Sequence, residues 1–237
     1  MTSLQNRRGP LSRGLGADGP LSIPRFVWLL LTCAVILGSS YLVDRCLGQP
    51  VGQLSTMINL DGEANLPTWF SAVQWFTVAA VMTLVVDRRF EPSDPRSLAL
   101  WALPLGFLVF SVDEVVKGHE YAGFLTDVVL PGASRNESPL PSTGAFGFTI
   151  GIPFMLLTGL LLVLVRPYLQ DASGAFMRIA FGIGLFLLGA VGFDFLSNFL
   201  TPDSLEWIAG IYVEETLEMF GATIILWGSY LLAARPD

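Results

Sequence analysis

The sequence predicts an all-α fold, a polytopic membrane bundle of about six transmembrane helices with both termini in the cytoplasm. The first observation is composition, because 52% hydrophobic and only 14% charged residues, with a mean hydropathy of +0.60, leave too little wettable surface for a soluble domain. The second is that the apolar residues gather in six stretches of roughly the twenty residues that cross a bilayer core. The third is that most basic residues flank these stretches on one side.

The chain divides into two predicted parts. Residues 1–25 are polar and rich in Gly, Pro and Arg, which favours a flexible cytoplasmic tail, and residues 26–234 form the six-helix transmembrane domain. A signal peptide is the alternative for the beginning of the chain. The apolar run from Phe26 to Val43 is longer than a usual signal sequence, and no small-residue cleavage site follows it. We therefore expect a retained first helix.

Clusters of Gly, Pro and polar residues separate the six stretches and predict surface loops. The predicted spans are 26–44, 68–86, 98–117, 145–165, 177–199 and 207–233. Lys and Arg beside a span stay on the cytoplasmic side, and an inside N-terminus places ten of the thirteen basic residues there. The three that fall outside are Arg45, Lys117 and Arg135.

Ionisable residues inside or at the ends of spans are the strongest functional signal, because charges at membrane depth are costly and usually face the bundle interior or a partner. They occur in the third, fifth and sixth spans: Asp113, Glu114, Lys117, His119 and Glu120; Asp194; and Glu214, Glu215 and Glu218. The predicted topology brings all three groups to the extracytoplasmic end of the bundle. The sequence therefore predicts one acidic site that contains the only histidine of the chain.

Helical spacing refines this site. Asp113, Lys117 and Glu120 stand at i, i+4 and i+7 and would form one stripe, while Glu218 can share a face with Glu214 or Glu215. Like charges this close cannot all stay ionised unless a cation, a proton or a basic side chain intervenes. The spacing from Glu114 to His119 requires a helix end or a kink if both are to reach one centre.

A carboxylate-rich site with one imidazole suits a divalent metal such as Ca²⁺, Mn²⁺, Fe²⁺ or Zn²⁺. The predicted metal ligands are Glu114, His119, Glu215 and Glu218, with Asp113, Lys117, Glu120, Asp194 and Glu214 around them. A three-His zinc centre, a bis-His haem and a thiolate cluster are excluded, because the chain has one His and two distant Cys. No catalytic residue and no organic cofactor is predicted.

Three segments in this order, LDGEANLPTWFS, SVDEVVKGHE and EETLEMFG, resemble a family of uncharacterised bacterial multipass membrane proteins. The resemblance covers most of the chain from about residue 50 onward. It implies a shared fold and a site at the outer face. It implies no activity. We expect the protein in the bacterial inner (plasma) membrane.

Three classes of function stay open. A cation site could be structural or catalytic, with metal-activated water attacking a lipid or membrane-embedded substrate. A proton- or ion-linked transport protein is the second, although the inner halves of the spans hold almost no ionisable residues. The third is an accessory subunit of a membrane complex whose charges only form salt bridges, or lie at the headgroup level. The predicted partners are the lipid bilayer and other membrane proteins; no basic cluster indicates nucleic acid.

Overall fold

The computed structural model of the protein describes residues 23–62, 64–91, 93–130, 139–141, 143–170 and 174–234. These residues form helices and connecting segments, with no strand among them. The α-helices are α1 (Arg25–Cys46), α2 (Gly52–Met57), α3 (Leu66–Arg89), α4 (Ala99–Val116), α5 (Gly118–Val129), α6 (Ile152–Leu169), α7 (Ala175–Leu187), α8 (Asp194–Ser197) and α9 (Leu205–Ala233). A π-helical turn (Gly147–Gly151) leads into α6, and another (Leu188–Phe193) joins α7 to α8.

Six helical segments are long and apolar enough to cross a membrane, which confirms the predicted fold class. They are Arg25–Cys46, Leu66–Arg89, Ala99–Val116, Gly147–Leu169, Ala175–Ser197 and Leu205–Ala233. Local sequence explains how two of them begin: Asn65 accepts a hydrogen bond from the Thr68 amide at the start of α3, and Ser204 accepts one from the Trp207 amide at the start of α9. Most of the predicted tail, residues 1–22, lies outside the described residues.

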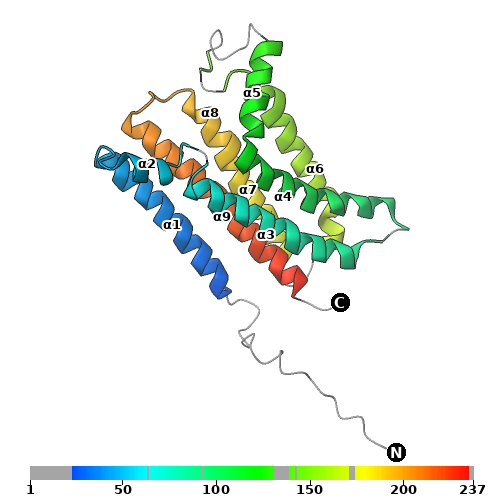
Figure 1. Ribbon diagram of the computed structural model, residues 1–237. Coiled ribbons are helices and arrows are strands. Elements are labelled where there is room, and N and C mark those ends of the chain that lie inside the picture. Colours follow the sequence, from blue (N-terminus) through cyan, green and yellow to red (C-terminus); the bar gives the residue numbers. More distant parts are fainter. Residues whose placement is uncertain are drawn as a thin grey trace, which may run out of the picture.

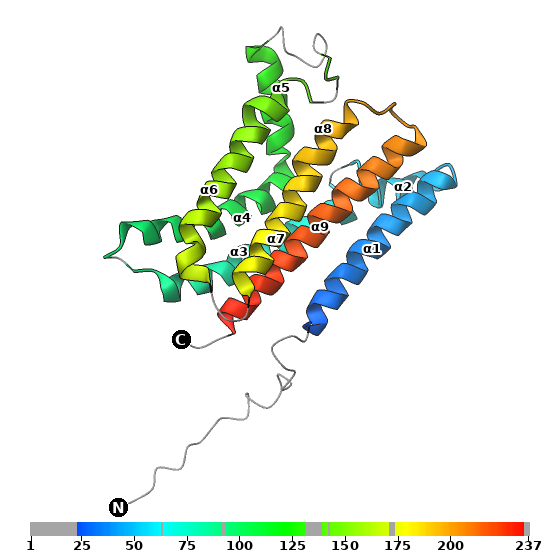
Figure 2. The same ribbon diagram turned by 180° about the vertical axis from the view of Figure 1, so that it is seen from behind.

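Helix α9 lies at the centre of the bundle. Helices α1, α3 and α7 pack against it, α4 packs against α3, and α6 lies at the periphery (Figures 1 and 2). The start of α1 and the end of α9 lie at one end of the bundle. We call the opposite end, where α1 finishes and α9 begins, the polar end, because most acidic residues of the spans lie in that half; Asp87, near the end of α3, does not.

Helices α7 and α9 make the closest contact in the bundle because glycines face backbone atoms there. A Cβ built on Gly182 would lie 2.7 Å from the Gly221 carbonyl oxygen, and one on Gly228 would lie 2.8 Å from the Ala175 carbonyl oxygen. Distances this short admit no side chain. Small residues therefore allow the two backbones to touch, as is common between helices in lipid.

An apolar core fills the half of the bundle away from the polar end. On the side of the core nearest the polar end, the Trp75 ring of α3 stacks on Phe107 and meets the Phe110 and Phe186 rings edge-on. The ring centroids are between 4.9 and 5.7 Å apart. Below this cluster, buried aliphatic side chains from α3, α4, α6, α7 and α9 complete the core. Dense packing here holds the spans in one arrangement.

Two short helices lie where the sequence predicts only loops and the end of a span. Helix α2 follows α1, and α5 follows α4 after a single left-handed residue, Lys117, with φ of 59°. The predicted span 98–117 therefore ends one residue early, at Val116. This break has direct consequences for the acidic site, because it ends the helical register before His119 and Glu120.

Candidate functional site

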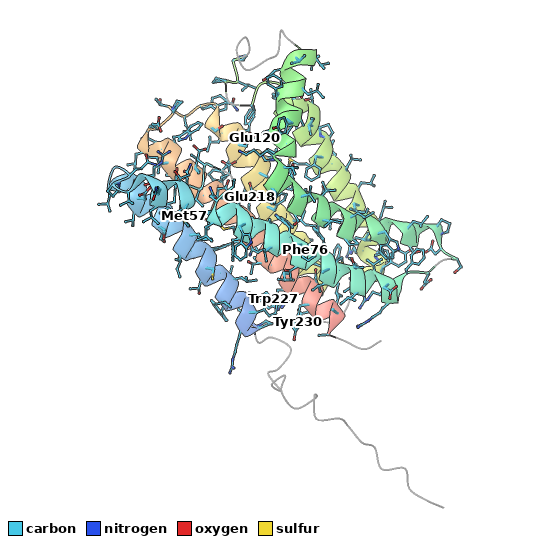
Figure 3. All side chains as sticks on the ribbon, viewed as in Figure 1. Met57, Phe76, Glu120, Glu218, Trp227 and Tyr230 are labelled. Carbon is cyan, nitrogen blue, oxygen red and sulfur yellow. The ribbon has the colours of Figure 1, made fainter. Side chains whose placement is uncertain are left out.

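The three glutamates of α9 lie on one uninterrupted helix, in its half nearer the polar end. Each is partly buried between neighbouring helices. Figure 3 places Glu218 between Glu120, near the start of α5, and Trp227, toward the other end of α9. Within the described residues, the carboxyls of Glu214 and Glu218 have no hydrogen-bond partner and no salt bridge.

Helices α4 and α8 and one loop bring further acids to these glutamates, and helix α5 brings His119. The Glu218 carboxyl lies close enough to interact electrostatically with Glu114 of α4 and Asp194 of α8. The Glu214 carboxyl interacts in the same way with Asp194, with Asp61 of the α2–α3 segment and with His119 of α5. We call the five acids of the helices, Glu114, Asp194, Glu214, Glu215 and Glu218, the carboxylate cluster.

The contact of Gly189 with α9 determines how closely the span Ala175–Ser197 approaches the glutamates of α9. A Cβ at Gly189 would lie 2.8 Å from the Glu214 carbonyl oxygen and 2.9 Å from the Glu218 Cγ. The π-helical turn Leu188–Phe193 contains this glycine and ends at the residue before Asp194. Such turns change the direction of the side chains that follow them, and here the turn immediately precedes the acid contributed to the cluster.

His119 lies in a tight local arrangement with Asp113, across the break between α4 and α5. One Asp113 oxygen accepts a hydrogen bond from the His119 amide at 2.9 Å, and the other lies 2.7 Å from His119 Nδ1. Gly118 permits this geometry, because a Cβ there would lie 2.7 Å from the Asp113 oxygen. An ionised Asp113 requires the proton on Nδ1, and when the ring is neutral the second ring nitrogen, Nε2, carries the lone pair that can bind a cation.

The predicted stripe of Asp113, Lys117 and Glu120 is wrong. The helix ends at Val116, and the left-handed Lys117 changes the direction of the chain before Glu120. As a result Asp113 contacts His119, whereas Lys117 pairs with Glu120 at 3.5 Å on the exposed surface. The Lys117–Glu120 pair, three residues apart, keeps a spacing of the predicted stripe, whereas the contact between Asp113 and His119, six residues apart, is one that a continuous helix does not make.

Asp194 and Asn198 have different roles. Asp194 belongs to the carboxylate cluster, but Asn198, one turn later, points elsewhere. The Asn198 side chain accepts from the Thr143 amide at 3.1 Å and donates to the Thr143 hydroxyl at 3.0 Å. Asn198 therefore ties α8 to the segment before α6 and supports the bundle.

Sequence reasoning missed the contribution of α1. The Arg45 guanidinium donates to the Tyr41 hydroxyl at 3.4 Å and pairs with Asp203 at 3.8 Å. Asp61 keeps an accessible surface, yet the protein around it desolvates its carboxyl and raises its pKa above the usual range, with Asp203 and Glu120 adding to the shift and Arg45 opposing it. A lone Arg just after an apolar run was the signal in the sequence that could have indicated the Arg45–Asp203 pair.

Sequence reasoning also missed a polar pair on the side of the site away from the polar end. The buried Gln74 side chain of α3 donates to the Thr223 hydroxyl at 2.7 Å and to the Met219 carbonyl oxygen at 3.3 Å. Its own carbonyl oxygen, Oε1, has no hydrogen-bond partner among the described residues. An amide between apolar neighbours is difficult to assign from spacing, because a single polar residue also suits a lipid-facing or loop-proximal position.

The predicted metal ligands are gathered in one region but are not arranged as a coordination sphere. Glu114, Glu215 and Glu218 belong to the carboxylate cluster, and His119 lies beside it, close to Glu214. In the part of the chain that the structure describes, no three His, Cys, Asp or Glu side chains are placed to hold one metal ion. A bound metal would require these side chains to turn toward a common point.

The fold and the site together define a polytopic helical membrane protein with a carboxylate cluster between its spans. The chain belongs to the family DUF8692, a domain of unknown function, whose model matches residues 26–234. This confirms the expected membership of an uncharacterised family. No curated protein and no solved structure matches the chain.

Proposed function

We propose that the protein binds a divalent cation at the carboxylate cluster. The observation that carries the proposal is that Glu214 and Glu218, in a membrane-spanning helix, have no hydrogen-bond or salt-bridge partner among the described residues while other acids surround them. Uncompensated charge at membrane depth is costly. A cation that draws the carboxyls together would remove this cost and supply the missing partner.

The pairing of Asp113 with His119 supports a metal in particular. Histidines that bind metals usually donate their other ring nitrogen to a carboxylate, which fixes the tautomer and the orientation of the ring. The 2.7 Å contact between Asp113 and His119 Nδ1 is of this kind. Metal-activated water, with a glutamate as base, is the chemistry that such an ion would supply toward a lipid or membrane-embedded substrate.

Ion- or proton-linked transport is the competing function, and the packing disfavours it. A transported ion needs polar groups across the whole bilayer. Below Gln74 and Thr223, the described part of the bundle is filled by buried apolar side chains such as Val78, Met82 and Ile225. Apolar packing therefore separates the site from the opposite end of the bundle.

The proposal includes an orientation and a location. Arg25, Arg88, Arg89, Arg166 and Arg178 lie at the end of the bundle opposite the carboxylate cluster. The positive-inside rule then places that end, with both termini, in the cytoplasm and the cluster on the extracytoplasmic side. We propose the inner (plasma) membrane of a bacterium as the location, because the motifs resemble bacterial proteins.

Elemental analysis tests the cation site. Detergent-purified protein is incubated separately with Mn²⁺, Ca²⁺ and Zn²⁺, freed of unbound ion by gel filtration, and measured by inductively coupled plasma mass spectrometry. We expect wild-type protein to retain at least one of these ions stoichiometrically, and the Glu214→Gln/Glu218→Gln variant to lose it. The amide keeps the size of each side chain and removes the charge.

Glu206→Gln is the matched control, because Glu206 is exposed in the first turn of the same helix. This variant should retain the ion as wild type does. Folded wild-type protein that retains none of the three ions would overturn the proposal and indicate carboxyls neutralised by protons. Equal retention by wild type and the double variant would place the ion elsewhere.

The Asp113→Asn variant should bind the same ion about 10- to 100-fold more weakly, the usual effect of removing a carboxylate that orients a metal-binding histidine. Asparagine can still accept from the His119 amide, so the start of α5 is preserved. Isothermal titration with the retained ion measures the change in Kd. Glu120→Gln, which removes an exposed charge paired with Lys117, should leave Kd unchanged; an unchanged Kd for Asp113→Asn would exclude His119 from the site.

A further inference from the structure

Helix α5 has two contrasting faces. Tyr121, Phe124 and Val128 recur at three- and four-residue spacing, and 69%, 63% and 62% of their respective surfaces are exposed. Leu125 and Val129 widen the same apolar arc. The buried residues Gly123 and Thr126 lie on the opposite side. The helix therefore presents its apolar side away from the bundle, the reverse of a helix in water.

The position of α5 places this apolar face at the level of the membrane surface. A Cβ on Gly123 would be 3.8 Å from the ring of Phe146, the residue immediately before the span Gly147–Leu169. Residue 123 is thus level with the outer end of that span. In both views α5 and the beginning of the α6 segment lie side by side (Figures 1 and 2).

The exposed apolar face of α5 continues the lipid-facing surface of its neighbours. On α4, exposed Val109, Val112 and Val116 lead up to the break at Lys117, and the apolar arc of α5 begins four residues later. On the α6 side, Phe148 and Ile152 are also exposed at the end of their span. No charged residue interrupts the arc, since Glu120 and Asp127 lie on its polar side by helical spacing.

We propose that α5 is an interfacial helix, whose face of Tyr121, Phe124, Leu125, Val128 and Val129 lies in the outer leaflet of the bilayer. This face contacts lipid at the boundary between the acyl chains and the headgroups. The contact is stabilised by burial of apolar side chains and not by charge, because the arc carries no basic residue. Since His119 is in the first turn of α5, contact with the membrane also supports the position of the Asp113–His119 pair. The inference stands whether or not the cluster binds a cation.

Site-directed spin labelling tests the proposal on full-length protein in phosphatidylcholine vesicles. Cys33→Ser/Cys46→Ser supplies a background without native thiols, and single nitroxide labels are attached at Phe124→Cys and Val128→Cys. Leu156→Cys, exposed in the middle of a span, is the lipid-facing control, and Glu120→Cys is the control on the polar side of α5. Collision rates with molecular oxygen, which partitions into lipid, and with a water-soluble nickel chelate are compared.

Labels at 124 and 128 should resemble the label at 156, with an oxygen-to-nickel collision ratio several-fold higher than at 120. Two results would overturn the proposal. Ratios equal to that at 120 would place the face in water, and low collision with both reagents would show that protein, such as a second copy of the chain, covers it. The substituted side chains are exposed, so the fold does not depend on them; gel filtration of each labelled variant confirms this.

Discussion

A Gly189→Val variant should lose about 3 kcal/mol of stability, the upper end of the cost of overpacking a core. The added Cβ would meet the Glu214 carbonyl oxygen at 2.8 Å and the Glu218 Cγ at 2.9 Å. The backbone oxygen cannot turn aside as a side chain can, so α7 and α9 must separate. Unfolding of detergent-solubilised protein, followed by intrinsic tryptophan fluorescence during a denaturant titration, measures the loss.

Gly184→Val is the matched control on the same helix. A Cβ at Gly184 would meet nothing within 4 Å, so valine there should change stability by less than about 1 kcal/mol, the scale of helix propensity alone. Equal losses at the two positions would mean that the α7–α9 contact does not hold the bundle together. If the proposed cation site exists, Gly189→Val should also release the retained ion, because the displaced helix carries Asp194.

A Trp75→Ala variant should lose about 3 kcal/mol, the lower end of the range for large aromatic truncations in soluble cores. The lower value applies because the side chains of a span remain in lipid in the unfolded state, so no transfer from water contributes. The lost packing and the cavity account for most of the cost. Trp75 is 1% exposed and contacts Phe107, Phe110 and Phe186, which joins α3 to α4 and α7. The same denaturant titration measures it.

Trp69→Ala removes an identical side chain from the same helix at a position that is 62% exposed. Its cost should be less than about 0.5 kcal/mol, as for surface substitutions away from special features. A loss at position 69 as large as that at position 75 would contradict the assignment of Trp75 to the core. The comparison also corrects for the general effect of removing a tryptophan from the fluorescence signal.

The spans could be predicted because their cause is local. An apolar segment of about twenty residues must satisfy its backbone hydrogen bonds within itself in lipid, so composition and length decide that it is a helix. The six predicted spans accordingly agree with the six membrane-length helices. Helices α2 and α5 were missed because both are shorter than a span and lie among polar and turn-forming residues.

The failure to predict the break at Lys117 was the error with the largest effect on the predicted site. Lysine is a common residue inside helices, and a left-handed lysine has no local signature. Asp113 stabilises the break by binding the amide and the ring of His119, a contact that a continuous helical register would forbid. The same break supplies the helix end that the spacing from Glu114 to His119 requires.

The sequence by itself determined the class of protein, the number of spans and the residues worth examining, because hydropathy and the rarity of charges in lipid act position by position. Tertiary structure decided which of those residues meet. Gly189 and the π-helical turn that contains it bring Asp194 to Glu214 and Glu218, and the αL residue Lys117 turns His119 toward Asp113. These contacts depend on backbone approach and helix direction, which are properties of the packed bundle and not of any one segment.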